Sequence, residues 1–213
     1  MSDVEFFFDP VCPWAWITSR WVAEVAEQRG LDVEWRFIAL RILNDAEDYE
    51  TAFPAGYIAG HGAGQKLLRV AAAVRAEQGP ARIAELYTAW GSDIHVNGRR
   101  DEIVGDWENG FPDYLRSIGI EDRFVDAAND RSWDEVLETE TAEALDRVGK
   151  DVGTPIITNH LADGRALSFF GPVMSRIPRG ADALELWDAV WTVAGFAGMA
   201  ELKRSLREQP VTS

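Results

Sequence analysis

This chain of 213 residues contains one cysteine, Cys12, and only three histidines. One cysteine excludes a disulfide within the chain, and the scattered histidines give no metal-ligand spacing, so we predict no metal site. Positive charge is also scarce, because 21 Lys and Arg stand against 36 Asp and Glu, which leaves a net charge of -15. The chain therefore lacks the basic surface with which proteins bind nucleic acids and anionic membranes.

Long apolar runs and an export signal are missing as well. No segment approaches the length of a membrane span. Residues 1–8 carry two charges and have the pattern of a strand, so we expect no signal peptide. Together with the single cysteine, these features predict a protein of the reducing cytoplasm.

The residues that are present suffice for a large core. Hydrophobic residues make up 46% of the chain and include nine tryptophans, enough for one domain or one domain with an insertion. Val4–Phe8 predicts a buried strand, and Pro13–Arg29 predicts a helix that Gly30 ends. Residues 31–38 alternate between apolar and polar side chains, as in a second strand. Short links between strand, helix and strand predict that the two strands are parallel.

The middle of the chain, from residue 44 to residue 149, predicts helices and loops without a strand. Ser132 is a candidate N-cap with Glu135 three residues later, which would form a capping box. The glycine-rich segment 60–64 around His61 predicts a flexible loop, since no phosphate-binding motif surrounds it. The predicted helices cover residues 65–78, 81–90, 103–107, 113–118 and 132–148.

Strand signals return near the end, at residues 154–158 and 165–170, and a helix is predicted over residues 184–196. The element order is therefore βαβ, a helical block, ββ and a final helix. This order predicts an α/β protein with a thioredoxin fold into which an all-helical domain is inserted. We expect residues 1–43 and 150–213 to form the discontinuous thioredoxin-like domain and residues 44–149 to form the inserted helical domain.

Cys12 lies between the predicted first strand and the predicted first helix, directly before Pro13. The first backbone N–H groups of a helix have no partner within the helix, and the helix dipole adds positive potential there. Both effects favour the thiolate, which is the nucleophile in thiol exchange. A lone cysteine is more often inert and buried, but this position predicts a catalytic nucleophile.

Thr154 and Pro155 are the second candidate feature, after Gly153. In a thioredoxin fold, a cis proline begins the strand that faces the redox thiol and exposes the backbone of the residue before it. An isolated X–Pro bond is seldom cis, so the topology carries the prediction that the Thr154–Pro155 bond is cis and faces Cys12.

Four segments resemble the mycothiol-dependent reductases of actinobacteria, which belong to the DsbA-like branch of the thioredoxin superfamily. They are residues 8–21 (FDPVCPWAWITSRW), 86–95 (LYTAWGSDIH), 151–155 (DVGTP) and 169–180 (FFGPVMSRIPRG). Members of that family carry a Cys-Pro-Trp-Cys motif, take electrons from mycothiol and reduce disulfides, and some act as nitroreductases. The resemblance implies that Cys12 is the nucleophile, that Pro155 is the cis proline, and that the cleft between the two domains binds mycothiol and disulfide or nitro substrates.

Ala15 departs from the family pattern, because it stands where the second cysteine would be. A chain with one thiol cannot resolve its own mixed disulfide, so an external thiol must do so. We therefore expect a monothiol oxidoreductase with Pro13, Trp14 and Ala15 beside the bound thiol. One alternative is a transferase or isomerase similar to the kappa-type glutathione transferases. The other is a non-catalytic binding or chaperone-like module.

His95 is a further candidate from the helical block. It would line the cleft with Gly153, Thr154 and Pro155 and assist proton transfer, or it is an ordinary histidine at the end of a helix. The sequence leaves a homodimer open and identifies neither the substrate nor, apart from the resemblance, the thiol.

Overall fold

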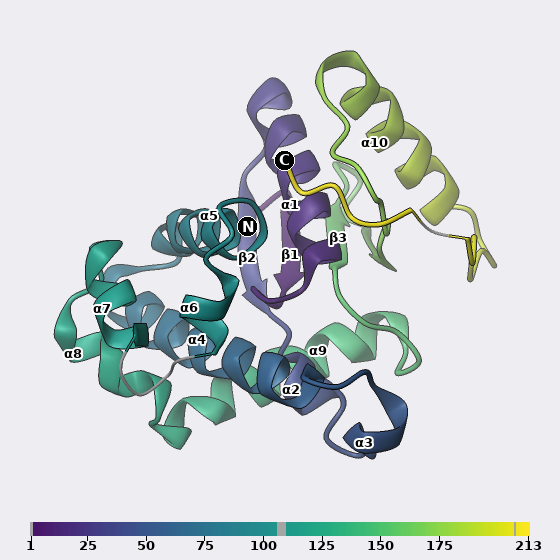
Figure 1. Ribbon diagram of the computed structural model, residues 1–213. Coiled ribbons are helices and arrows are strands. Elements are labelled where there is room, and N and C mark those ends of the chain that lie inside the picture. Colours follow the sequence, from purple (N-terminus) through teal and green to yellow (C-terminus); the bar gives the residue numbers. More distant parts are fainter. Residues whose placement is uncertain (1, 106–109, 207) are drawn as a thin grey trace.

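The computed structural model describes residues 2–105, 110–206 and 208–213. Four strands form one sheet in the order β2-β1-β3-β4 (Figure 1). Strands β1 (Val4–Phe8) and β2 (Val33–Phe37) are parallel, β3 (Ile156–His160) is antiparallel to β1, and β4 (Ala166–Phe170) is antiparallel to β3. The two ends of the sequence therefore meet in one sheet, which confirms the predicted α/β thioredoxin-type fold.

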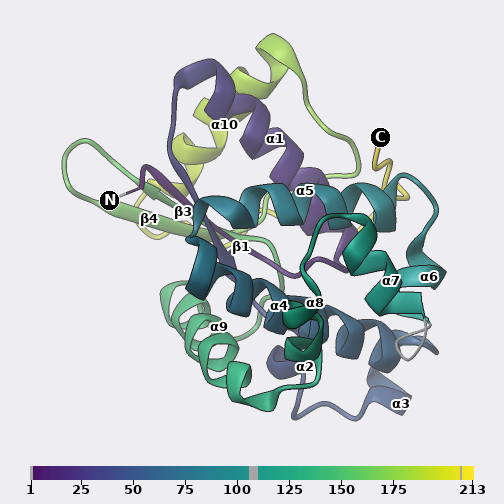
Figure 2. The ribbon, with the colours of Figure 1, turned by 90° about the vertical axis from the view of Figure 1, so that its left-hand side faces the viewer.

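Helices α1 (Pro13–Arg29) and α10 (Gly180–Ala194) lie on one side of this sheet, and α9 (Asp134–Val148) lies on the other (Figure 2). Trp21 of α1 packs against Trp187 of α10, with the ring centroids 5.3 Å apart. The Trp21 indole N–H donates to the carbonyl of Ala183 over 2.8 Å, so the polar atom of this buried ring is satisfied.

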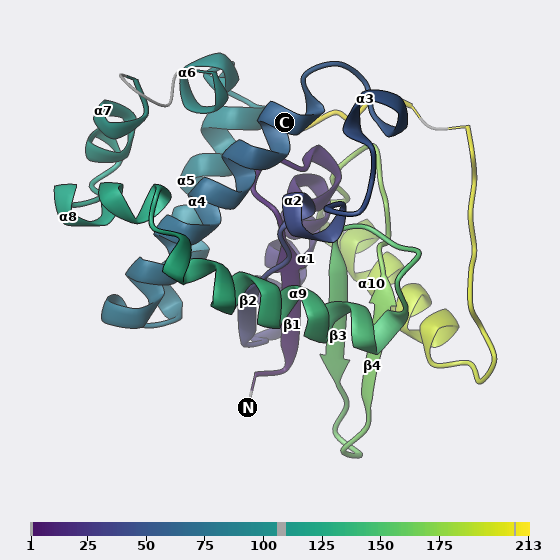
Figure 3. The same ribbon diagram turned by 90° about the horizontal axis from the view of Figure 1, so that it is seen from below.

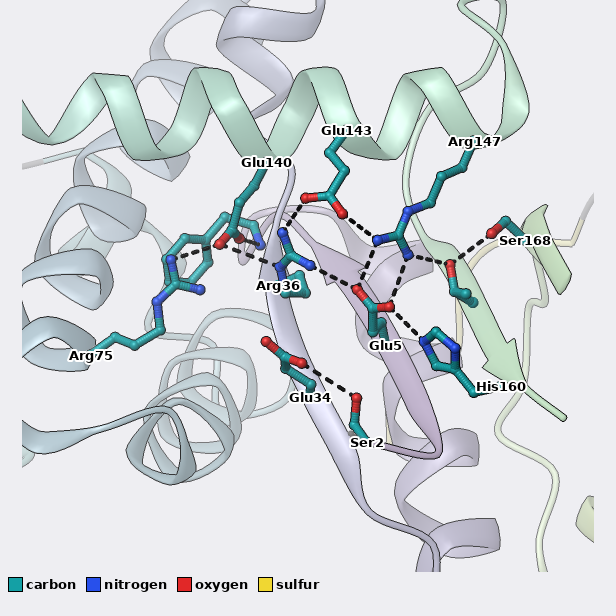
Figure 4. Close-up of polar contacts among 12 residues, drawn as sticks. Ser2, Glu5, Glu34, Arg36, Arg75, Glu140, Glu143, Arg147, His160 and Ser168 are labelled. Carbon is teal, nitrogen blue, oxygen red and sulfur yellow. Dashed lines mark hydrogen bonds and ion pairs between the residues drawn. The ribbon is translucent and has the colours of Figure 1, made fainter. Parts of the chain in front are cut away.

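The sheet face that α9 covers carries a network of charged side chains (Figure 4). Arg36 of β2 lies 2.7 Å from Glu5 of β1 and 3.3 and 2.6 Å from Glu140 and Glu143 of α9. Arg147 of α9 also lies 3.0 Å from Glu5. Opposite charges thus meet in pairs, and the network attaches α9 to the sheet.

The helical block packs against the sheet through one large core cluster, and a smaller second cluster joins Ala144 of α9 to Phe7 and Ile156. Phe8 of β1 stacks on Tyr87 with a centroid separation of 3.8 Å, and Trp35 of β2 contacts the same ring. The division into two domains at residues 43 and 150 stays a prediction. The block's elements, apart from α9, are α2 (Leu40–Leu43), α3 (Tyr49–Ala52), α4 (Tyr57–Gln78), α5 (Ala81–His95), α6 (Arg100–Val104), α7 (Gly110–Ser117), α8 (Asp122–Val125) and 3-10 turns at Asp126–Ala128 and Arg131–Trp133.

The prediction of a flexible loop at residues 60–64 is wrong, because α4 begins at Tyr57 and includes this segment. Glycine is a poor helix former, yet tertiary packing requires it here. A Cβ at Gly64 would lie 2.4 Å from a carboxylate oxygen of Asp9. Close approach between α4 and the end of β1 therefore explains the glycine, and His61 is buried in the helix.

Two other predictions about the helices are also wrong. Helix α5 continues past residue 90 through Gly91, where a Cβ would lie 2.1 Å from the Trp16 ring. The capping box at Ser132 does not form, because Ser132 lies in a 3-10 turn whose cap is Asp130. Predicted helix 103–107 overlaps α6, and residues 106 and 107 lie outside the described residues. None of the described helices has the length and apolar character needed to cross a membrane.

Candidate active site

Cys12 occupies the N-cap of α1, in the short loop between β1 and the helix. Its backbone is extended, and its sulfur accepts the N–H of Ala15 over 3.5 Å. Pro13 follows at the first helical position, where the missing N–H removes no helical hydrogen bond. The predicted placement of the thiol at a helix N-terminus is therefore confirmed.

The loop before β3 brings Thr154 against the sulfur. The Thr154–Pro155 peptide bond is cis, as the sequence predicted. The Cys12 thiol donates to the Thr154 carbonyl over 3.8 Å, and the Thr154 hydroxyl donates to the carbonyl of Phe7 over 3.1 Å. Residues 142 positions apart in the chain thus meet at one sulfur. Gly153 precedes this pair. A Cβ added at Gly153 would have the ring of Phe170 as its nearest neighbour, at 3.8 Å.

The protonation of Cys12 differs from the prediction. Cys12 is only 7% exposed, and burial raises the pKa of its thiol to about 12. The N–H groups of Ala15 and Trp14 and the charge of Arg100 lower the pKa, and the charge of Asp9 raises it, but burial outweighs all of these. The buried thiol is therefore protonated at neutral pH, so a thiolate requires the sulfur to gain access to water or to a ligand.

Asp9 is a site residue that the sequence reasoning missed. Its carboxylate is fully buried and accepts the N–H of Val11 over 3.0 Å and that of Leu40 over 2.9 Å. Burial raises the pKa of Asp9 to about 7, against the lowering effect of these two hydrogen bonds and of Arg100. The carboxylate holds the Cys12 loop against α2 and, through Gly64, against α4. In the sequence, the only feature that pointed to Asp9 as a site residue was its position directly after a buried strand.

His95, at the end of α5, contacts the other side of the same loop. Its Nε2 lies 2.9 Å from the carbonyl oxygen of Pro10. A carbonyl only accepts, so Nε2 carries the hydrogen in this contact. Burial lowers the pKa of His95 to about 4, so the ring is neutral at pH 7. His95 therefore lines the Cys12 loop, and a role in proton transfer stays a prediction.

The two tryptophans of the motif have different environments. Trp16 is 3% exposed, and its ring stacks on His95 with a centroid separation of 5.9 Å. Trp14 is half-buried. Ala15 between them is fully buried, with its N–H directed at the sulfur. Cys12, Pro13, Trp14, Ala15, Thr154, Pro155 and His95 thus come from three parts of the chain, and their roles in binding stay predictions.

The arrangement supports thiol chemistry on one sulfur. An attacking thiolate would lie beside the N–H of Ala15 at the helix start and beside the carbonyl of Thr154. In the described ranges, no group of three or more His, Cys, Asp and Glu side chains is arranged to hold a metal ion.

Comparison with known proteins identifies relatives of this chain. The chain is 31% identical over 206 residues to the uncharacterized protein Rv2286c of Mycobacterium tuberculosis, covering 96% of this chain and 82% of that protein. Its structure resembles the cytosolic disulfide reductase DsbM of Pseudomonas aeruginosa, solved with GSH, at a TM-score of 0.50 and 18% identity over 78% of this chain and 88% of that one.

A second structural neighbour is a 2-hydroxychromene-2-carboxylate isomerase, at a TM-score of 0.55 and 15% identity over 89% of this chain and 94% of that one. At such low identity these two structures establish the shared fold alone. The family profile is more specific, because the profile described as that of the mycothiol-dependent nitroreductase Rv2466c matches residues 11–204. The chain therefore belongs to the Rv2466c-like family.

Proposed function

We propose that the protein is a monothiol oxidoreductase in which Cys12 exchanges with disulfides of a low-molecular-weight thiol. One observation carries the proposal. The only cysteine of the chain caps α1 beside Thr154, and fully buried Ala15 stands one helical turn further on. The chain can therefore form a mixed disulfide and has no second thiol with which to resolve it.

The proposed reaction has two exchanges. The Cys12 thiolate attacks one sulfur of a substrate disulfide, R–S–S–R′, so that a Cys12–S–S–R′ bond forms and R–S⁻ leaves. A second molecule of the thiol, as R′–S⁻, then attacks the outer sulfur of that bond. This step restores the Cys12 thiolate and releases R′–S–S–R′, so each turnover oxidises one external R′–S⁻ to a disulfide sulfur for every R–S⁻ released.

Family membership supports mycothiol as that thiol and nitro compounds as further substrates. The residues that would lie beside a bound thiol are Pro13 and Trp14, which follow Cys12, Thr154, whose carbonyl accepts from its thiol, and His95, which contacts the Cys12 loop at Pro10. We also propose a cytoplasmic location, which the single cysteine supports, since a reducing compartment keeps a lone thiol free.

Mass spectrometry after incubation with oxidised mycothiol, oxidised glutathione or oxidised coenzyme A tests the proposal. We expect one adduct on Cys12, released by the matching reduced thiol, and turnover that falls to the uncatalysed level in Cys12→Ser. An unmodified Cys12, or a Cys12→Ser variant with unchanged reductase activity, would contradict it.

A thiol-dependent transferase or isomerase is the second candidate. The observation that favours it is the raised pKa of Cys12, since a protonated thiol that hydrogen-bonds to Thr154 behaves like a hydroxyl. The fold shared with an isomerase is consistent with this candidate. In that case Cys12→Ser would retain turnover, because a serine hydroxyl makes the same hydrogen bonds, so the same variant separates the two candidates.

A further inference from the structure

The last residues of the chain return from α10 to α1 and to the end of α5, the two elements that carry Trp16 and His95 (Figures 1 and 3). The backbone N–H of Val211 donates to the carbonyl of Ser175 over 2.8 Å. The carbonyl of Thr212 accepts the indole N–H of Trp16 over 3.1 Å, and the Thr212 hydroxyl donates to the carbonyl of His95 over 2.5 Å. Two adjacent residues of the segment are thus held by three hydrogen bonds.

These three anchors lie in three separate segments of the chain. Trp16 lies on α1, one turn after Cys12, and His95 ends α5 and holds the Cys12 loop through Pro10. Ser175 lies in the connection between β4 and α10, close to the segment 171–172 whose Pro172 carbonyl accepts a hydrogen bond from α1. The segment therefore joins α1, the end of α5 and the β4–α10 connection, and two of these anchors, Trp16 and His95, adjoin the Cys12 loop.

The rest of the segment is loosely held. Leu202 and Leu206 are 82% and 87% exposed, which is unusual for large apolar side chains. Glu208 pairs only with the exposed Arg176 in the described part, and such surface pairs contribute little. Val211 itself is 46% exposed. The attachment of the last residues thus depends on a few hydrogen bonds at residues 211 and 212. These residues can therefore detach at a low free-energy cost while the rest of the protein stays folded.

We propose that residues 208–212 form a strap that restricts access to Cys12 and must leave its anchors before a thiol or disulfide substrate reaches the sulfur. The proposal concerns regulation of the site and rests on the proposed function for its biological meaning. With the strap attached, Cys12 is buried and its thiol is protonated. Release frees the Trp16 indole N–H and the carbonyls of His95 and Ser175, which become available to hydrogen-bond an incoming substrate.

A matched pair of substitutions at residue 211 tests the strap. Val211→Pro removes the N–H that donates to Ser175, whereas Val211→Ala keeps this N–H and shortens the side chain. The readout is the rate at which iodoacetamide alkylates Cys12 in the full chain near neutral pH. We expect Val211→Pro to raise the rate roughly three- to tenfold, the change in open population that follows from losing one hydrogen bond, and Val211→Ala to leave it unchanged.

A second pair checks the anchor on α5. Thr212→Val removes the hydroxyl that donates to His95, and Thr212→Ser keeps a hydroxyl at the same position. Thr212→Val should accelerate alkylation and Thr212→Ser should not. Melting temperatures should stay within error of the wild type in all four variants, because the segment lies outside the core. Equal alkylation rates within both pairs would overturn the proposal.

The measurement separates this proposal from the proposed function, because alkylation requires no thiol substrate. Faster alkylation of Val211→Pro without turnover on any thiol substrate would leave the strap standing and refute the oxidoreductase. Turnover on thiol substrates with equal alkylation rates within both pairs would refute the strap and leave the oxidoreductase standing.

Discussion

Two regions of this protein bury ionisable side chains, and they do so in opposite ways. On the α9 face of the sheet, three carboxylates meet three guanidiniums: Glu5, Glu140 and Glu143 with Arg36, Arg75 and Arg147. In the Cys12 loop, Asp9 and Cys12 are both nearly or fully buried, and their described hydrogen-bond donors are backbone N–H groups.

The pKa directions follow from this difference. Burial alone would raise the pKa of Glu5, but hydrogen bonds from Arg147 and His160 and the nearby charges lower it below its ordinary value. Asp9 has backbone donors and a more distant Arg100, so burial prevails and its pKa rises to about 7. Compensated charges give a stable attachment of α9, whereas the uncompensated Asp9 carboxylate places one protonation in the Cys12 loop near neutral pH.

Removing Glu5 should have the largest effect on stability. Glu5→Ala leaves Arg36 and Arg147 without a shared buried partner, and breaking a buried pair in this way costs about 3–5 kcal/mol. Urea denaturation measures the free energy of unfolding. The exposed Glu121, which pairs with Arg123, is the control, and Glu121→Ala should leave stability unchanged within error. Similar losses of unfolding free energy in Glu5→Ala and Glu121→Ala would contradict the expectation that the buried ion pairs stabilise the fold more than the exposed pair does.

Asp9→Asn tests the uncompensated region through pH. The pKa of Asp9 is raised in the folded state from 3.8 to about 7, so the folded protein retains a proton that the unfolded chain loses. Stability contributed by this group is therefore present below about pH 4 and falls as the pH rises to 7, by up to about 4 kcal/mol.

Unfolding free energies measured between pH 4 and pH 7 check this expectation. The slope of stability against pH should be more negative in the wild type than in Asp9→Asn, whatever the absolute stability of the variant, because the lowered pKa of His95 contributes an opposite slope to both proteins. Thr141→Val is the control, because it removes an uncharged acceptor of the N–H of Ala39, the residue before Leu40. Its unfolding free energy should have the same slope against pH as the wild type. Parallel pH curves for the wild type and Asp9→Asn would show that Asp9 does not titrate in this range.

Gly64→Ala should produce a smaller effect. The added Cβ would lie 2.4 Å from Asp9, so α4 must move away from the Cys12 loop, at a cost of about 1–3 kcal/mol. Gly62 lies in the same helix with nothing within 4 Å of an added Cβ, so Gly62→Ala should stabilise the protein by about 0.5–1 kcal/mol. Thermal unfolding of the two variants gives the comparison, and a shift in the same direction for both would refute the close contact.

Local patterns in the sequence predicted the elements that carry the site. Val4–Phe8 and Pro13–Arg29 have the predicted bounds, because an apolar run, a proline at the helix start and Gly30 at its end are short-range signals. The prediction that Thr154 faces Cys12 followed from the order of strands and helices, and the hydrogen bond between the two residues confirms it. Gly64 of α4 and Gly91 of α5 were misleading, since they accommodate Asp9 and Trp16 from distant segments.

The sequence by itself determined that one thiol is available, that it caps a helix, and that no second thiol stands at residue 15. Only the tertiary structure decided the state of that thiol. Burial, the buried Asp9 and the bridging of Trp16, His95 and Ser175 by the last residues all arise from contacts between distant segments. Desolvation depends on everything that surrounds an atom, so local sequence can place a sulfur at a helix start but cannot set its proton affinity.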